Sequence, residues 1–317
     1  MRKILHAAAW TLLALLLIVG GGVALSWGPD VPVSALRARW AAAPSTFVPI
    51  DGLQVHLRDE GPRDDPMPIV LIHGTSASLH TWEGWVAALR GTRGVVTFDL
   101  PGFGLTGPSA TGDYSDAAYV RFTLQVLDAL GLQRVVLGGN SLGGAIAWQT
   151  AAAAPQRVAK LILVDAGGYP LDSVSVPIGF RIARLPLLRD VMRYSLPRSV
   201  VESSVRNVYG DAARVTPELV DRYMAMTSRA GNREALGRRM SQLEWGRDLP
   251  RLSTLAQPTL ILWGGRDRLI PPAHAQRFAH DIKGSTLVMF DELGHVPQEE
   301  DPAHTVAAVQ RFLASSD

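Results

Sequence analysis

The sequence has no cysteine, and this absence excludes three kinds of chemistry. The chain can form no disulfide framework, no thiolate metal site and no cysteine nucleophile. The sequence also lacks a large excess of one charge, because 31 basic and 29 acidic side chains give a formal net charge of only +2. The sequence contains neither a nucleic-acid-binding motif nor a stretch in which basic and aromatic residues alternate. We therefore expect no nucleic-acid partner.

Histidine spacing gives no sign of a metal centre. The close spacing typical of metal ligands is missing among the eight histidines of the chain. His56 falls in a predicted strand, while His274, His280 and His304 fall in predicted helices, so we interpret these four as structural or exposed. We predict neither a metal site nor a cofactor.

What the sequence does contain is a glycine-flanked serine, Gly139-Asn140-Ser141-Leu142-Gly143. It lies between an apolar run at 134–138 and a helix-forming run at 145–149. A G-x-S-x-G turn from strand to helix is typical of a nucleophile elbow, which lifts the serine hydroxyl above the C-terminal edge of a parallel sheet. So short a motif also arises by chance. Ser141 is therefore a candidate nucleophile that needs partners elsewhere in the chain.

The partners follow in the order that an elbow serine requires, an acid before a histidine. Asp267 comes just after an apolar run at 258–263, and His295 comes after a β-type run at 286–290. A serine hydroxyl becomes a good nucleophile when an imidazole takes its proton, and the imidazole needs a carboxylate to fix its tautomer. Asp165, which ends the run at 161–164, also precedes His295 and is an alternative acid.

A loop for the oxyanion is predicted after the apolar run at 68–72, where His73-Gly74-Thr75 follows. In elbow-type sites the oxyanion is held by two backbone N–H groups, one from the residue after the nucleophile and one from such an earlier loop. These are Leu142 and Thr75 here. His80 and Trp82 follow the loop, and they either line the pocket or pack helices.

Together these segments resemble the α/β-hydrolase superfamily. Besides the elbow, Phe98-Asp99-Leu100-Pro101-Gly102-Phe103-Gly104 is similar to the family's stretch after the fourth strand, and Gly294-His295-Val296-Pro297 is similar to its histidine loop. The resemblance places Asp267 at the usual acid position, although some relatives supply the acid from the position of Asp165. It implies a serine hydrolase of the esterase or lipase kind.

The pattern of elements agrees with this resemblance. β-type runs alternate with helical stretches, which indicates a parallel sheet covered by helices, and Asp51-Gly52 favours a hairpin that opens the sheet. The resemblance implies an α/β-hydrolase fold: a mostly parallel eight-stranded sheet flanked by helices, with a helical cap inserted after strand 6. We assign 46–168 and 247–317 to the core and 169–246 to the cap.

The predicted cap is rich in arginine. We interpret these side chains as the solvated face of amphipathic helices; contact with lipid headgroups or with an anionic substrate is the alternative. The arginines are Arg181, Arg184, Arg189, Arg193, Arg198 and Arg206.

The N-terminus predicts a membrane anchor or a signal segment over residues 1–28. Arg2 and Lys3 precede a run from Ile4 to Trp27 that contains no acidic or strongly basic side chain, long enough for a transmembrane helix of about 20 residues. Gly20-Gly21-Gly22 shortens the strongly apolar part, and a small-residue site at 24–26 would suit signal cleavage instead. Either interpretation exports the domain, to the periplasmic side in a bacterium. Residues 29–45 are predicted to be a linker.

The predicted reaction is the hydrolysis of a carboxylic ester, by a carboxylesterase or a monoacylglycerol-type lipase acting on a small-molecule ester or lipid. Serine at the elbow argues against the similar haloalkane dehalogenases and epoxide hydrolases, which use an aspartate. Carbon-carbon bond hydrolases keep the serine, but their longer glycine-rich oxyanion loop is not matched at 73–78. That activity, a lactonase and a non-catalytic binding scaffold remain the alternatives.

Overall fold

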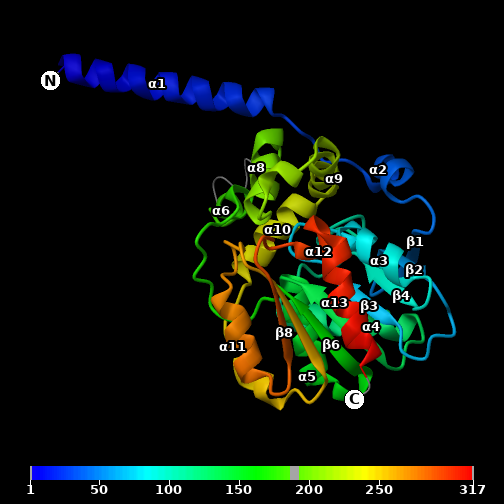
Figure 1. Ribbon diagram of the computed structural model, residues 1–317. Helices are drawn as coiled ribbons and strands as arrows, with labels where there is room; N and C mark the ends of the chain where they lie inside the picture. The colour runs from blue at the N-terminus through cyan, green and yellow to red at the C-terminus, as the bar shows by residue number, and fades with distance from the viewer. Residues whose placement is uncertain (1, 186–192, 316–317) are drawn as a thin grey trace.

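A computed structural model describes residues 2–185 and 193–315 of the chain (Figure 1). Its centre is an eight-stranded sheet with the order β1-β2-β4-β3-β5-β6-β7-β8, so the predicted eight-stranded sheet is confirmed. The strands are β1 (Thr46–Ile50), β2 (Leu53–Glu60), β3 (Ile69–Ile72), β4 (Val95–Phe98), β5 (Val135–Asn140), β6 (Val158–Val164), β7 (Thr259–Gly264) and β8 (Thr286–Phe290).

The sheet is antiparallel at one end and parallel elsewhere. β1 pairs antiparallel with β2, and β2 pairs antiparallel with β4, whereas every pairing from β4 through β8 is parallel. The turn between β1 and β2 places Asp51 and Gly52 at φ values of 51° and 75°. Positive φ at both central residues is what a two-residue hairpin turn with Asp-Gly requires. The predicted opening hairpin is therefore present.

Helices cover both faces of the sheet, because alternate strand residues point to opposite faces. In β3, Ile69 and Leu71 pack with α3 and α13, while Val70 and Ile72 pack into the core formed by α4, α5 and α11. The covering helices are α3 (Glu83–Leu89), α4 (Asp116–Ala129), α5 (Leu142–Ala153), α11 (Ala273–Asp281), α12 (Pro297–Glu300) and α13 (Pro302–Ala314). Short 3₁₀ turns are η1 (Leu79–Trp82), η2 (Pro155–Arg157), η3 (Ala212–Arg214) and η4 (Leu249–Thr254).

The cap segment, residues 169–246, runs between β6 and β7. Its described helices are α6 (Ile178–Ala183), α8 (Arg198–Val208), α9 (Pro217–Ser228) and α10 (Asn232–Ser241), and Figure 1 shows them gathered at one end of the sheet. A small apolar cluster that includes Val201, Val205 and Val220 holds α8 against α9, and Val296 of the histidine loop joins it. The cap segment thus packs directly on the loop that carries His295.

The cap arginines are divided between ion pairs and the pocket. Arg193, Arg198 and Arg206 each pair with an acidic side chain of the cap segment itself, as expected for a charged, solvated helix face. Arg184 instead lines a cavity beside Ser141. Arg189 lies outside the described residues.

The N-terminal helix α1 (Arg2–Leu25) projects away from the domain in Figure 1. The chain that follows it is bonded to the cap segment: Trp27 bridges Ser195, and Val31 bridges Arg229. Within the described ranges, no helix combines the length and the hydropathy that a membrane crossing needs. The prediction of a transmembrane helix in residues 1–28 is therefore not supported, and the three glycines at 20–22 lie where the apolar run weakens.

The predicted linker at 29–45 contains a helix that the sequence analysis missed, α2 (Val33–Trp40). Leu36 of this helix is buried and packs with Leu105 and Met226. The backbone carbonyl of Trp40 also lies 2.9 Å from His80 Nε2. Tertiary contacts with the core and the cap segment therefore order this stretch.

Candidate active site

Ser141 lies at the sharp turn between β5 and α5. Its backbone has φ 56° and ψ −115°, a conformation that non-glycine residues adopt only when the surroundings enforce it. The Ser141 N–H donates to the Val164 carbonyl at 3.0 Å, and the Ser141 carbonyl accepts from the N–H groups of Ala145 and Gly167 at 3.0 and 2.9 Å. These bonds hold the strained turn in place between two strands and a helix.

The glycines of the motif are required by close backbone contacts. A Cβ on Gly139 would lie 2.2 Å from the backbone of Gly143, and a Cβ on Gly143 would lie 2.1 Å from the carbonyl oxygen of Ile72. Both distances are far inside van der Waals contact. The elbow can therefore turn this tightly only with glycine at these two positions.

The structure brings His295 and Asp267 together. The distance from His295 Nδ1 to Asp267 Oδ2 is 2.7 Å, and both residues are buried, with 4% and 3% of their surfaces exposed. The other carboxylate oxygen of Asp267 accepts from the N–H groups of Leu269 and Ile270 at 2.8 and 2.9 Å. A carboxylate held by these donors fixes the imidazole with Nδ1 protonated and Nε2 available as a base.

Two further side chains hold the histidine loop, and the sequence analysis missed both. Asn140 Nδ2 donates to the His295 carbonyl at 2.9 Å. Glu300 accepts from the N–H groups of Gly294, Gly210 and Asp211 at 2.8 to 2.9 Å. The only feature of the sequence that pointed to Asn140 is its position next to Ser141. Glu300 carried none, because two of its partners belong to the cap segment.

The loop after β3 approaches the elbow closely. A Cβ on Gly74 would lie 3.0 Å from Asn140 Oδ1 and 3.1 Å from Ser141 Cβ, so glycine allows this approach. His73 Nε2 accepts from the Leu100 N–H at 3.0 Å, which leaves Nδ1 to donate to the Gly74 carbonyl at 2.7 Å. Burial lowers the pKa of His73, which keeps the imidazole neutral in this role.

The two predicted oxyanion donors both line the first cavity together with Ser141. Thr75 lines both cavities that reach Ser141, and Leu142 is the first residue of α5. The first N–H groups of a helix have no partner within the helix, so the Leu142 amide is available to a ligand. His80 and Trp82 do not line either cavity; both are buried and pack η1 onto its neighbours.

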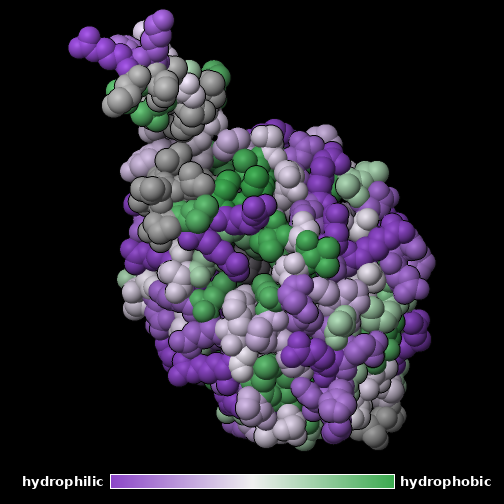
Figure 2. All heavy atoms as spheres, turned by 90° about the vertical axis from the view of Figure 1, so that its left-hand side faces the viewer, coloured by the Kyte–Doolittle hydropathy of each residue, from purple (hydrophilic) through white to green (hydrophobic). Residues whose placement is uncertain are grey.

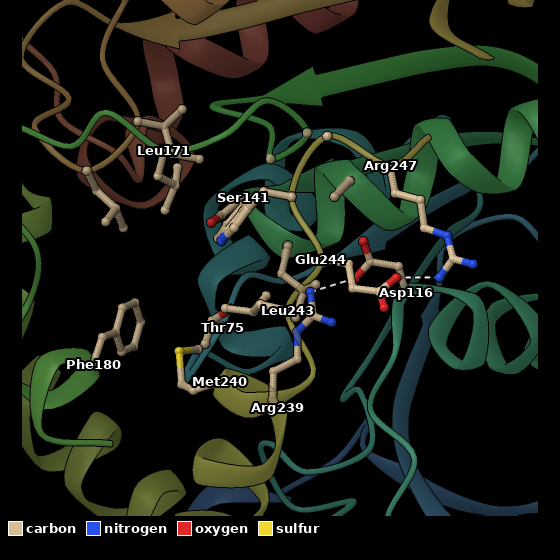
Figure 3. Close-up of a pocket in the computed structure, with 18 of the residues that line it drawn as sticks. Thr75, Asp116, Ser141, Leu171, Phe180, Arg239, Met240, Leu243, Glu244 and Arg247 are labelled. Carbon is tan, nitrogen blue, oxygen red and sulfur yellow. Dashed lines mark hydrogen bonds and ion pairs between the residues drawn. The ribbon is translucent and has the colours of Figure 1, made fainter. Parts of the chain in front are cut away.

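Two cavities of similar size meet at Ser141. The first, of about 790 Å³, has Leu171 and Phe180 on one side of the serine and Asp116 and Arg247 on the other (Figure 3). Its polar side contains two ion pairs, Arg239 with Asp116 and Arg247 with Glu244. The second cavity, of about 780 Å³, is lined by His295 and by apolar residues of the cap segment, Leu196, Val200, Val201, Val205 and Val208.

The alternative acid, Asp165, lies beside the same histidine. One side-chain oxygen or nitrogen from each of Asp165, Asp267 and His295 falls within 4.8 Å of the others. Three such groups could surround a metal ion, but both carboxylate oxygens of Asp267 already accept hydrogen bonds, from His295 and from two backbone N–H groups. We therefore interpret the group as a histidine with two neighbouring carboxyl groups. Of the two acids, Asp267 is the one that makes the short contact with His295 Nδ1.

With this geometry established, comparison with known proteins identifies the family. A family model described as the alpha/beta hydrolase fold matches residues 67–302. The chain belongs to the α/β-hydrolase family. The resemblance that the motifs predicted is thereby confirmed, and membership of this family supports a hydrolase.

Relatives within the α/β-hydrolase family differ in what is known of them. An uncharacterized protein of Mycobacterium tuberculosis is 34% identical, over 78% of this chain and 76% of its own length. A 2-hydroxy-6-oxo-2,4-heptadienoate hydrolase of Pseudomonas putida is 31% identical, over 84% of this chain and 95% of its own. The solved meta-cleavage product hydrolase of Pseudomonas fluorescens superposes with a TM-score of 0.73 at 25% identity, covering 86% of this chain and 97% of that one.

Proposed function

We propose that this α/β-hydrolase cleaves carboxylic esters through an acyl-enzyme on Ser141, as a carboxylesterase or a monoacylglycerol-type lipase. The observation that carries the proposal is the 2.7 Å contact between His295 Nδ1 and Asp267, in a site whose second cavity is lined by both Ser141 and His295. That contact leaves His295 Nε2 as the base for a serine hydroxyl.

In the first half of the proposed reaction, Ser141 Oγ attacks the ester carbonyl carbon while His295 Nε2 takes the hydroxyl proton. The N–H groups of Leu142 and Thr75 stabilise the oxyanion, and loss of one such donor typically costs about 10²- to 10³-fold in kcat. His295 then gives the proton to the departing alcohol. In the second half, His295 activates a water molecule that releases the acid and restores the serine.

The two cavities give the proposed substrate a direction. The leaving alcohol must lie near the base that protonates it, and His295 lines only the second cavity. We therefore assign the apolar second cavity to the alcohol and the first cavity to the acyl group. The ion pairs on one side of the first cavity favour acyl groups that end before them or carry a polar group, since desolvating those charges opposes a long alkyl chain there.

Carbon-carbon bond hydrolysis is the second candidate, favoured by the 31% identical 2-hydroxy-6-oxo-2,4-heptadienoate hydrolase. The same nucleophile and base would serve. The loop at 73–78 lacks the longer glycine-rich stretch of carbon-carbon bond hydrolases, and we therefore place ester hydrolysis first.

Hydrolysis of p-nitrophenyl esters with graded acyl chains tests the proposal, using residues 29–317 and the Ser141→Ala variant. We expect kcat/KM to be highest for short and medium chains and to fall at least about 10⁴-fold in Ser141→Ala. Folded protein without ester hydrolysis, together with cleavage of a meta-cleavage product, would favour the second candidate.

We also propose that residues 1–28 associate the hydrolase with a membrane, with the catalytic domain outside the cytoplasm. Support comes from apolar side chains that α1 exposes to solvent, and Figure 2 shows hydrophobic atoms on this projecting helix. They are Leu5, Trp10, Leu12, Leu13 and Leu17. Flotation with anionic liposomes should carry the full chain and leave residues 29–317 behind. Recovery of a chain shortened near residue 26 from the native host would indicate a secreted, cleaved form instead.

A further inference from the structure

Asp165 is a buried carboxyl group that the proposed mechanism does not use. It follows β6 directly, is fully buried and has φ 44°, a backbone conformation that is uncommon outside glycine, although aspartate tolerates it better than most residues. Its N–H donates to the Leu262 carbonyl at 3.0 Å. The end of β6 therefore holds this side chain close to the pair formed by Asp267 and His295.

The two carboxyl groups have very different hydrogen-bond partners. Asp267 receives two backbone N–H groups and the imidazole of His295. Asp165 Oδ1 receives one, the Gly264 N–H at 3.0 Å, while Asp165 Oδ2 is buried and has no donor. A buried carboxylate oxygen without a donor is costly, whereas a protonated oxygen is itself a donor.

Two carboxyl groups this close in a buried site cannot both carry charge at low cost. The proton belongs on the group with fewer donors. We propose that Asp165 is a neutral carboxylic acid that points its proton toward the charged Asp267, acting as a positioning residue, and that it becomes the partner of His295 when Asp267 is neutralised. The neutral state of Asp165 rests on the carboxyl geometry alone. Its pairing with His295 rests also on the proposed serine hydrolase mechanism.

The electrostatics of the site agree with the donor count. Burial raises the pKa of Asp165 well above its ordinary value, and the negative charge of Asp267 raises it further. The other titratable groups around it are His295, from the loop after β8, and Glu300 of α12, whose charge also raises the pKa. The Gly264 N–H opposes these effects. Loss of the charge on Asp267 therefore removes a principal reason for Asp165 to stay protonated.

The substitution Asp267→Asn should thus leave a working acid behind. Asp165 releases its proton to solvent, and a carboxylate oxygen already within 4.8 Å of the imidazole pairs with His295 Nδ1. In a triad with a single acid, the corresponding Asp-to-Asn change costs about 10⁴-fold in kcat. Here we expect a loss of only about 10²-fold, with the remainder lost when both acids are replaced.

The rate at which a fluorophosphonate labels Ser141 tests this in the full chain, for wild type, Asp165→Asn, Asp267→Asn and the double variant. Asp165→Asn keeps a donor toward Asp267 and should cost less than about 10-fold. In the Asp267→Asn background the same change should cost about 10²-fold. Equal effects in the two backgrounds would show that Asp165 has only a structural role and would overturn the proposal.

A pH profile separates the two roles further. Labelling of Asp267→Asn should rise with pH as Asp165 ionises, and this step should vanish in the double variant. If it persists there, the ionising group is not Asp165 and the second half of the proposal is wrong.

The neutral state of Asp165 can be measured without any activity, by ¹³C NMR of the aspartate side-chain carboxyls at pH 7. We expect one carboxyl resonance at the protonated position in wild type, absent from Asp165→Asn and moved to the ionised position in Asp267→Asn. An ionised Asp165 in wild type would contradict the first half of the proposal. If the protonated resonance is present but the fluorophosphonate labels neither the wild type nor any variant, the hydrolase mechanism and the pairing of Asp165 with His295 are both wrong.

Discussion

The Glu300 carboxylate connects the histidine loop to the cap segment through hydrogen bonds to both. Its carboxylate accepts from the Gly294 N–H next to His295 and from the Gly210 and Asp211 N–H groups of the cap segment. Charged hydrogen bonds of this kind each contribute about 1.5 to 3 kcal/mol. Glu300 therefore helps to position His295 relative to the cavity that His295 lines.

Replacing Glu300 by alanine should lower the free energy of unfolding by about 3 kcal/mol, because three buried or partly buried N–H groups lose their acceptor. It should also lower kcat through displacement of His295. Urea unfolding and ester kinetics measure the two effects. Glu202→Ala removes a partly exposed acid that pairs with Arg206 and should change stability by less than about 1 kcal/mol; equal losses in the two variants would contradict the role of Glu300.

At the residue scale, the sequence could predict candidate catalytic residues that the structure brings together, but not the residues that hold them in place. Ser141, Asp267 and His295 follow strands in an order that the elbow chemistry requires, and the structure places Asp267 and His295 in contact. Asn140 and Glu300 act through backbone groups that become neighbours only after the chain folds. Such contacts leave no local pattern, so sequence reasoning could not find them.

At the element scale, the turn from β5 to α5 depends on packing against β3. The Cβ of an alanine at position 143 would lie 2.1 Å from the Ile72 carbonyl oxygen, and neither the central strand nor the first turn of the helix can move away cheaply. The elbow is therefore intolerant of even one added methyl group.

We expect Gly143→Ala to destabilise the fold by more than about 3 kcal/mol, in the range of severe core overpacking. Gly91→Ala is the matched control, because a Cβ there meets no atom within 4 Å and the backbone has no positive φ. Thermal melts should show a large loss for the first variant and almost none for the second. A stable, active Gly143→Ala would mean that the elbow is not built as described.

Strands were predicted well and the N-terminal elements poorly, for a physical reason. Strands buried on both faces of a parallel sheet read as continuous apolar runs, and the run at 258–263 overlaps β7, whose six residues are all buried. Helix α2 has only eight residues, and its one buried side chain, Leu36, contacts residues far along the chain. An isolated helix of that length is unstable, so its sequence carries no sufficient signal.

For the whole molecule, buried histidines make stability depend on pH. His80 bonds to the Trp40 carbonyl and to Ser78, and burial lowers its pKa from 6.5 to about 4. The unfolded chain therefore takes up a proton at His80 below pH 6.5, whereas the folded chain resists until about pH 4. The sign follows from linkage: this group makes unfolding easier as pH falls from 6.5 to 4 and adds nothing further below that.

The free energy of unfolding should accordingly fall by about 3 kcal/mol through His80 across that interval, at 1.36 kcal/mol per pKa unit. His73, whose pKa burial also lowers, adds to the loss. Urea melts at pH 7, 5.5 and 4.5 measure the slope, and His80→Gln should flatten it. An unchanged slope in His80→Gln would show that other groups control the pH dependence.

In the proposed mechanism, Ser141 is the activated nucleophile of an α/β-hydrolase site. Intact-mass spectrometry of the chain after brief treatment with a fluorophosphonate, followed by peptide mapping, tests it most directly. We expect one adduct per chain, located on Ser141, absent from Ser141→Ala and formed much more slowly in His295→Ala. No adduct on folded wild-type protein, or an adduct on another residue, would contradict it.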